Sequence, residues 1–239
     1  MKEPIFTGAA VAIITPMNED GSVNYKEFGR FIDWQIENGT DAIVVCGTTG
    51  ESSTLEVDEH SECIKWCVDY VNGRCKVIAG TGSNSTASAI ELSVEACKDG
   101  ADALLLVTPY YNKTSQRGLV AHYKAIHDAT DKPIILYNVP SRTGMNILPE
   151  TAAELAKLPR INGVKEASGN LEQIAEIKEL CADELNIWSG NDDQIYDVLE
   201  RGGLGVISVL SNVCPRETHD IVAKYLNGDK TGSKALMDK

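Results

Sequence analysis

Eight short runs of β-branched and aliphatic residues constrain the fold of this chain more than any other feature of its sequence. Runs of this length, apolar at nearly every position, are typical of strands buried on both faces, as in parallel sheets. We therefore predict eight parallel strands. They cover residues 11–15, 42–46, 76–80, 103–107, 133–138, 161–165, 186–189 and 205–209.

Longer segments with helical periodicity separate most of these runs. They cover residues 25–38, 57–71, 86–99, 116–129, 149–158, 171–181 and 193–201. Capping residues support several boundaries: Asn84 and Ser85 precede one helix, Gly39 and Gly100 follow two others, and Pro149 fits a first helical turn. Parallel strands that alternate with helices form sheets covered by helices.

Eight strands that alternate with helices match the strand count of a (β/α)8 TIM barrel, an α/β fold. The alternative is a doubly wound open sheet. An open sheet that binds a dinucleotide carries a glycine-rich fingerprint after its first strand, whereas residues 16–21 here read PMNEDG, an ordinary turn. We therefore expect residues 1–225 to form the barrel and residues 226–239 to begin a further helical segment.

Composition excludes several classes of protein. The chain has 239 residues, of which 43% are hydrophobic, enough for one large or two small domains. Its net charge of −13 argues against affinity for nucleic acid. It has no apolar run long enough for a membrane span and no secretory apolar region near its start, so we expect a cytoplasmic protein.

Seven cysteines are scattered through the chain, mostly in apolar stretches, and we interpret them as reduced and buried. Cys63 and Cys67 share a helical face, but no histidine or second cysteine pair completes a zinc site, so we expect no bound metal.

Chemically capable residues follow five of the predicted strands. In a barrel the carboxyl ends of the strands meet at one mouth, where catalytic groups gather. Hydroxyls, one arginine and one lysine converge there. The segments are GTTGE at 47–51, TPYYN at 108–112, YNVPSRTG at 137–144, Lys165, and SGND at 189–192.

Lys165 ends a short apolar run, and a lysine in that place is either part of a salt bridge or a Schiff-base nucleophile. Desolvation disfavours the ammonium form and lowers the pKa of a buried lysine from about 10.4. An ordinary lysine at neutral pH is only roughly one part in a thousand free amine, so burial increases its reactivity.

Each neighbouring group has a functional and a structural interpretation. The GTTG turn can direct backbone N–H groups and hydroxyls toward a carboxylate, or can be a plain strand-to-helix turn. Tyr137 can relay protons or pack in the core. Arg142 can hold a carboxylate with two donors or pair with a surface acid. We expect Glu51 to cap or pair at a helix start and His60 to lie at a surface or interface.

Taken together and in order, the segments GTTGE, TPYYN, YNVPSRTG, GVKEASGN (163–170) and GVISV (205–209) resemble the dihydrodipicolinate synthase family of pyruvate-dependent class I aldolases, over nearly the whole chain. The resemblance implies that Lys165 forms an imine with pyruvate, and that the resulting enamine attacks L-aspartate 4-semialdehyde. The product is 4-hydroxy-tetrahydrodipicolinate, a precursor of diaminopimelate and lysine. It also implies that no metal or organic cofactor takes part.

The resemblance assigns roles to individual residues. Thr48, Tyr137 and Tyr111 form a proton relay, in which Tyr111 reaches into the site of a neighbouring subunit of a homodimer. The pyruvate carboxylate is held by Thr49 and the backbone of Thr48, and the semialdehyde carboxylate by Arg142. The pocket near the imine is lined by Gly190 and Ile207.

Other functions remain open at this point. N-acetylneuraminate lyase and 2-keto-3-deoxy sugar acid aldolases share the lysine and the tyrosine but lack the context of Arg142. A non-catalytic pyruvate-binding barrel is a second possibility, although Lys165 and Tyr137 are both present. A phosphate-binding barrel needs a glycine-rich loop after a late strand, and Gly190 and Gly202-Gly203 are weak versions of one.

The sequence departs from the family pattern in two respects. The family continues with helices beyond residue 239, so we expect a truncated form, of lowered stability, that is a dimer more readily than a tetramer. The residues that match the family's lysine effector site are Ser52, His60, Asn84 and Tyr110. Val57 and Ser88 replace a histidine and an acid of that site, so we expect weak or absent inhibition by lysine.

Overall fold

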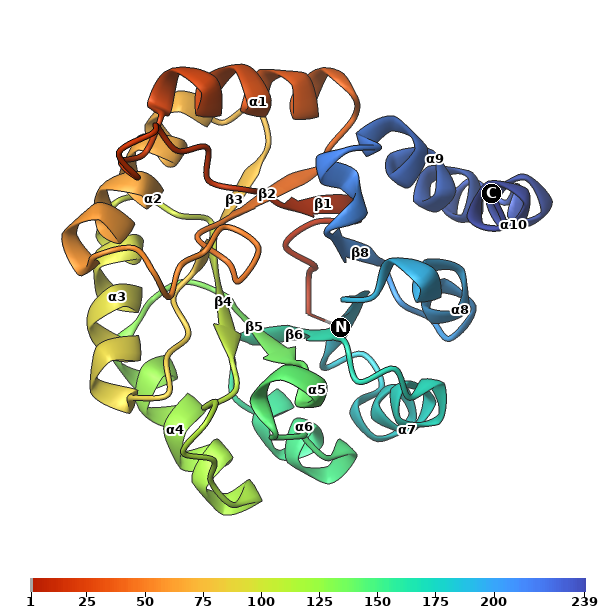
Figure 1. Cartoon of the computed structure of the whole chain (residues 1–239). Helices are drawn as coiled ribbons and strands as arrows, with labels where there is room; N and C mark the ends of the chain where they lie inside the picture. The colour runs from red at the N-terminus through yellow and green to blue at the C-terminus, as the bar shows by residue number, and fades with distance from the viewer. Residues whose placement is uncertain (1) are drawn as a thin grey trace.

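The computed structural model describes residues 2–239 and shows a closed barrel of eight parallel strands in the order β1 to β8 (Figure 1). The TIM barrel predicted from the sequence is therefore confirmed. The strands are β1 Gly8–Ala12, β2 Ala42–Val45, β3 Lys76–Gly80, β4 Ala103–Val107, β5 Ile134–Asn138, β6 Ile161–Glu166, β7 Asn186–Ser189 and β8 Gly205–Ser208.

Helices form a ring outside the strands (Figure 1). They are α1 Tyr25–Glu37, α2 Val57–Val71, α3 Thr86–Lys98, α4 Gln116–Ala129, α5 Pro140–Thr143, α6 Pro149–Ala156, α7 Leu171–Cys181, α8 Ile195–Glu200, α9 Pro215–Leu226 and α10 Lys230–Met237, with 3-10 turns η1 Asp192–Gln194 and η2 Leu210–Asn212. The predicted caps are present in the structure. The Ser85 hydroxyl accepts from the Ser88 amide at the start of α3, and Gly39 and Gly100 follow their helices with φ of +91° and +90°.

Apolar residues pack in two layers. The larger layer lies between strands and helices, and the smaller fills the barrel, where Trp188 stacks on Phe6 with ring centroids 5.0 Å apart. None of the helices in residues 2–239 has the length and apolar character that crossing a membrane requires.

The first strand was predicted at residues 11–15 but spans Gly8–Ala12. Its partner β8 explains the difference, because Gly8 pairs with Gly205 where the barrel closes. A Cβ on Gly205 would lie 1.8 Å from the Gly8 carbonyl oxygen, and φ of Gly205 is +154°. Closure therefore requires glycine, a poor strand former that apolar periodicity does not detect.

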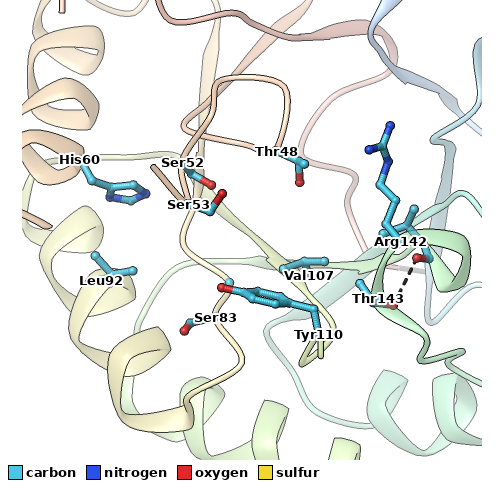
Figure 2. A pocket seen from close by; sticks show the side chains of 12 residues that line it. Thr48, Ser52, Ser53, His60, Ser83, Leu92, Val107, Tyr110, Arg142 and Thr143 are labelled. Atoms are coloured by element: carbon cyan, nitrogen blue, oxygen red, sulfur yellow. Dashed lines mark hydrogen bonds between the residues drawn. The ribbon is translucent and has the colours of Figure 1, made fainter. Parts of the chain in front are cut away.

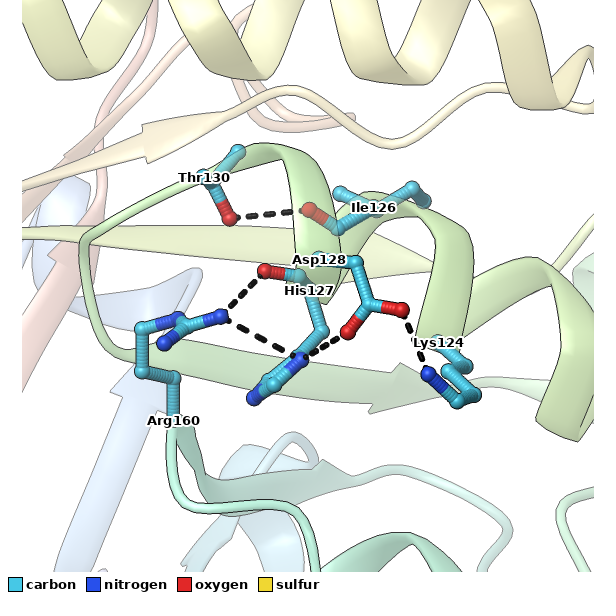
Figure 3. Close-up of polar contacts among 6 residues, drawn as sticks. All are labelled: Lys124, Ile126, His127, Asp128, Thr130 and Arg160. Carbon is cyan, nitrogen blue, oxygen red and sulfur yellow. Dashed lines mark hydrogen bonds and ion pairs between the residues drawn. The ribbon is translucent and has the colours of Figure 1, made fainter.

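Polar contacts fix the end of the barrel opposite the mouth. Arg160, just before β6, donates to the His127 carbonyl at 2.6 Å, and the His127 ring lies 2.9 Å from the Asp128 carboxylate (Figure 3). The Lys2 ammonium donates to the carbonyl oxygens of Leu158 and Ile161. These contacts hold the start of β6, the strand that carries Lys165.

The last helix packs back on the preceding one. Within α10 the Ser233 hydroxyl donates to the Ile221 carbonyl of α9 at 2.7 Å, and the Lys230 ammonium lies 2.8 Å from the Glu200 carboxylate of α8. Residues 226–239 are thus joined to the helical layer of the barrel.

Candidate active site

A cavity of about 680 Å³ opens at the carboxyl ends of the strands. Five of the predicted site residues line it: Thr48, Thr49, Tyr137, Arg142 and Gly190. The remaining lining residues are Val139, Ser141, Ala167, Asn191, Asp192, Asp193 and Val209. The segments after β2, β5, β6, β7 and β8 therefore meet at one site, as barrel geometry requires.

Lys165 lies inside the barrel next to this cavity, with only 3% of its surface exposed. It pairs with Tyr137 across the β5–β6 ladder, and its Nζ atom lies 4.4 Å from the Tyr137 ring centroid. Burial lowers the pKa of Lys165 to about 8, Asp192 raises it, and Arg142 lowers it further. At neutral pH roughly a tenth of the amine is then free, which suits nucleophilic attack on a carbonyl group.

Tyr137 is 8% exposed and belongs to the apolar cluster inside the barrel. Burial raises the pKa of its phenol, and Arg142 partly opposes this change. The phenol therefore holds its proton at neutral pH and can donate a hydrogen bond to a substrate beside Lys165.

Gly190 leaves space for the lysine side chain. A Cβ at this position would lie 2.7 Å from the Ala167 Cβ and 3.1 Å from Lys165 Cε, both too close for ordinary packing. Ile207 is fully buried in the same interior cluster as Tyr137.

Arg142 belongs to α5, a single turn that runs from Pro140 to Thr143 and is capped by Gly144 with φ of +70°. This turn was not predicted as a helix, because four residues are too few to show a period. Within residues 2–239 Arg142 makes no ion pair, and its exposed side chain lines the cavity. It is therefore available for an anionic ligand, and the surface pairing considered above is not observed.

A second cavity of about 300 Å³ adjoins the first and shares Thr48, Val139 and Arg142 with it. Ser52, His60 and Tyr110 line it, with His60 on one side and Arg142 on the other (Figure 2). Asn84 lies next to it and donates to the Tyr110 carbonyl at 3.3 Å. The structure thus brings together the four residues that match an effector site.

Two sequence-based expectations were wrong. His60 is 4% exposed, and its Nε2 atom lies 3.0 Å from the Gly80 carbonyl oxygen, so burial of the inner face of α2 replaces the expected surface position. Glu51 lies in a turn with φ of +59°, six residues before α2 begins at Val57. It therefore does not cap that helix.

Tyr111 differs from the other predicted site residues. It is 90% exposed, has φ of +68°, and does not line either cavity of its own chain. Exposure of a large aromatic ring in a conformation that costs energy for a non-glycine residue suits a group that acts outside its own subunit.

Asp192 is a cavity residue that the sequence patterns did not predict. It lines the larger cavity, and its Oδ2 atom accepts from the backbone amides of Val209 and Leu210 at 3.1 and 2.9 Å. Its position directly after β7, in segment 189–192, could have indicated a site residue. The sequence offered no partner for an acid among hydroxyl groups, so no role was predicted for it.

All seven cysteines are free, and Cys63 and Cys67 are fully buried as expected, while Cys75, Cys97 and Cys214 are partly exposed. In the part of the chain that the structure describes, no three His, Cys, Asp or Glu side chains are arranged to hold a metal ion.

The closed barrel, with a buried lysine amine of lowered pKa beside a tyrosine at the mouth, is the arrangement of the lysine-dependent aldolase class. The model of the Dihydrodipicolinate synthetase family matches residues 5–239, and the chain belongs to this family.

Relatives agree with this assignment. A 4-hydroxy-tetrahydrodipicolinate synthase of Lachnoclostridium phytofermentans is 59% identical over 234 residues, which cover 98% of this chain and 80% of that protein. Another 4-hydroxy-tetrahydrodipicolinate synthase, from Caldicellulosiruptor saccharolyticus, is 58% identical over 236 residues, which cover 99% of this chain and 80% of that protein. The crystal structure of dihydrodipicolinate synthase from Aquifex aeolicus superposes with a TM-score of 0.95 at 43% identity, over 98% of this chain and 80% of that one.

Proposed function

We propose that the chain is a 4-hydroxy-tetrahydrodipicolinate synthase, which condenses pyruvate with L-aspartate 4-semialdehyde on the route to diaminopimelate and lysine. The observation that carries this proposal is the Lys165 amine, buried against Tyr137 with a pKa lowered to about 8. The family and the similarity to named synthases support the choice of substrates.

Imine formation is the first step. The neutral Lys165 amine attacks the keto carbon of pyruvate, and the resulting carbinolamine loses water to give an iminium. The leaving oxygen needs a proton, which the phenol of Tyr137 is placed to donate. A hydroxyl relay through Thr48, continued by Tyr111 of the partner subunit, returns that proton in our proposal.

Carbon–carbon bond formation follows. Loss of a methyl proton from the iminium gives an enamine, whose carbon attacks the aldehyde carbon of the semialdehyde. The aldehyde oxygen takes up a proton and becomes the hydroxyl of the product, which balances the proton lost from the methyl group. The amino group of the condensed product then attacks the imine carbon, which closes the ring and expels the Lys165 amine. The chemistry consumes no oxidant and requires no group beyond the protein and its two substrates.

Substrate recognition follows from the charges at the mouth. Thr49 and the Thr48 backbone hold the pyruvate carboxylate in the proposal, and the unpaired Arg142 holds the semialdehyde carboxylate with two parallel donors. Arg142 also distinguishes this function from that of a sugar-acid aldolase, because a neutral aldehyde gives the guanidinium no partner.

Borohydride trapping tests the proposal directly. Reduction in the presence of pyruvate is expected to add a pyruvyl group to the peptide that contains Lys165, and aspartate semialdehyde is expected to diminish the adduct by consuming the enamine. Intact and peptide mass spectrometry measure both. A folded protein without an adduct, or with one on another lysine, would refute the proposed mechanism.

We also propose a homodimer, because the Tyr111 ring is 90% exposed and lies outside both cavities of its own chain, where the proposed relay needs a phenol from a partner. Light scattering is expected to give twice the mass of the chain, and Tyr111→Phe is expected to reduce turnover while Lys165 still forms its imine. A fully active monomer would contradict this proposal.

Inhibition by lysine is expected to be weak or absent. Among residues 2–239, no acidic side chain lines the smaller cavity, and Val57 is 66% exposed and does not line it. A lysine ammonium would lack a charge-assisted partner there. Initial rates at increasing lysine concentration measure this; half-inhibition at low concentration would show that another group supplies the charge.

A further inference from the structure

Glu166 follows Lys165 on β6 and is 1% exposed, yet the chemistry above gives it no role. Successive residues of a strand point to opposite faces. Lys165 points into the barrel, so Glu166 points outward, toward the layer of helices. A carboxylate is therefore buried directly behind the nucleophile.

Hydrogen-bond donors surround this carboxylate. The Ser168 amide donates to Oε1 at 2.7 Å, and the Asn138 amide group donates to Oε2 at 2.9 Å and to Oε1 at 3.2 Å. The Gln173 amide group lies 3.5 Å from Oε2. Burial raises the pKa of Glu166 above its usual value, and these hydrogen bonds oppose that rise only in part. Each of these three partners donates, so a protonated carboxyl group would find no acceptor among them, and the geometry suits an ionised carboxylate, which only accepts.

The contacts continue beyond Glu166. Asn138 also donates to Asn146 Oδ1 at 2.8 Å, and Asn146 exchanges hydrogen bonds of 2.7 and 3.1 Å with Gln173. We call Asn138, Asn146, Glu166 and Gln173 the Glu166 network. It joins the end of β5, the end of β6, the segment before α6 and the first turn of α7.

Two parts of the active site depend on this network. On the β5–β6 ladder, Tyr137 pairs with Lys165, and the next pair is Asn138 with Glu166. The first pair faces into the barrel and the second faces outward, toward the helices. Asn138 also accepts from the Ile147 amide at 2.9 Å. The segment that carries Arg142 is thereby fixed at both ends, in β5 and at residues 146–147.

Stability alone does not account for such a network. Burying a carboxylate that has no cationic partner is costly, and apolar residues at buried polar sites are often as stable or more stable. The network lies behind the residues that require accurate placement, and small displacements of such residues reduce rates strongly.

We propose that Glu166, acting through Asn138, is a positioning residue of the active site: it aligns Lys165 with Tyr137 and holds the Arg142 segment over the cavity. This inference rests on the proposed function and adds to it a residue that touches neither substrate.

Glu166→Gln tests the proposal because it keeps the shape but exchanges an acceptor for a donor. The new amide group would face the donating amide of Asn138 or of Gln173. We expect a folded protein in which kcat and the rate of borohydride trapping fall tenfold or more. The pH midpoint of trapping is expected to stay unchanged, because the effect acts on geometry.

A reversed pair provides the rescue. In Asn138→Asp/Glu166→Gln the new carboxylate accepts from the new amide and still accepts from Ile147, while Asn146 can rotate its amide to donate. We expect the double variant to recover most of the activity that each single variant loses. Non-additivity of this kind shows that the two side chains act together.

Asn162→Asp is the matched control. Asn162 is 8% exposed, lies on the same strand at the opposite end of the barrel, and bonds Asn186 and Glu3. Like Glu166→Gln, the Asn162→Asp substitution exchanges an amide group and a carboxylate at a buried position. Melting temperature is expected to fall, as in Glu166→Gln, while kcat and trapping stay within twofold of the parent.

The outcomes separate the two proposals. A parent protein that forms no pyruvate adduct refutes the proposed function. If the parent reacts and the folded Glu166→Gln variant keeps kcat and both KM values within twofold of the parent, the positioning role is refuted. The role is also refuted if the variant only shifts the pH midpoint of trapping and reaches the parent's kcat at pH values above that midpoint. If Glu166→Gln does not fold, Asn146→Ala serves as the test, because it removes another member of the Glu166 network. We expect this variant to lose kcat severalfold, and an unchanged kcat would refute the positioning role.

Discussion

Replacing Lys165 with methionine is expected to abolish condensation and pyruvate trapping, a loss of at least about 10³-fold in kcat, because no other group forms the imine. The same variant is expected to be more stable than the parent. Lys165 has a pKa of about 8 in the folded protein and about 10.4 when unfolded, so at neutral pH burial of its charge costs roughly 3 kcal/mol. Methionine fills the same volume without that cost.

The sign of the pH dependence follows from the two pKa values. Below about pH 8 the amine is protonated in both states, and the folded parent bears the whole cost. Above about 10.4 both states are neutral and the cost disappears. The gain in melting temperature of Lys165→Met should therefore be full at pH 7 and shrink toward pH 10. A variant less stable than the parent at pH 7 would show that the ammonium is stabilised by its neighbours.

Replacing Arg142 with glutamine is expected to lower kcat/KM for aspartate semialdehyde by about 10²–10³-fold, since a doubly bonded guanidinium–carboxylate contact is worth roughly 3–4 kcal/mol. Arg142→Lys should recover part of the loss, because an ammonium lacks the planar pair of donors. Steady-state kinetics with each substrate varied in turn measures both effects.

Trapping of pyruvate provides the control for Arg142. Removing this cation is expected to raise the pKa of Lys165, because Arg142 lowers it in the parent. The trapping profile of Arg142→Gln should therefore move to higher pH and reach the parent's rate on the alkaline side. If trapping is lost at every pH, Arg142 serves imine formation and does not select the aldehyde.

Much of the fold was predictable because strands buried on both faces are apolar throughout. The bounds of β3, β4 and β7, and of α2, α4 and α7, agree with the sequence to the residue. The first strand was misplaced because a backbone contact at closure, invisible to periodicity, selects glycine there. Helix α5 was missed since it is too short to show a pattern.

The site was predictable in composition but not in geometry. The rule that polar residues after strands meet at one mouth predicted that Lys165, Tyr137 and Arg142 lie close together, and the structure brings them together because barrel topology joins the strand ends. Asp192 and Glu166 lie within the same motifs, but the motifs alone do not indicate a role for either residue. Their importance depends on what faces them, Val209 and Leu210 in one case and Asn138 in the other, and those partners come from distant parts of the chain.

The glycine pair that closes the barrel has a consequence for directed evolution. Gly205 lies on the same short strand as Ile207, within the region that a library aimed at new aldehyde acceptors would randomise. Any side chain at Gly205 meets the backbone of Gly8, which cannot turn aside as a side chain can. Diversity is best confined to the segments after the strands, where variants can change selectivity and still fold.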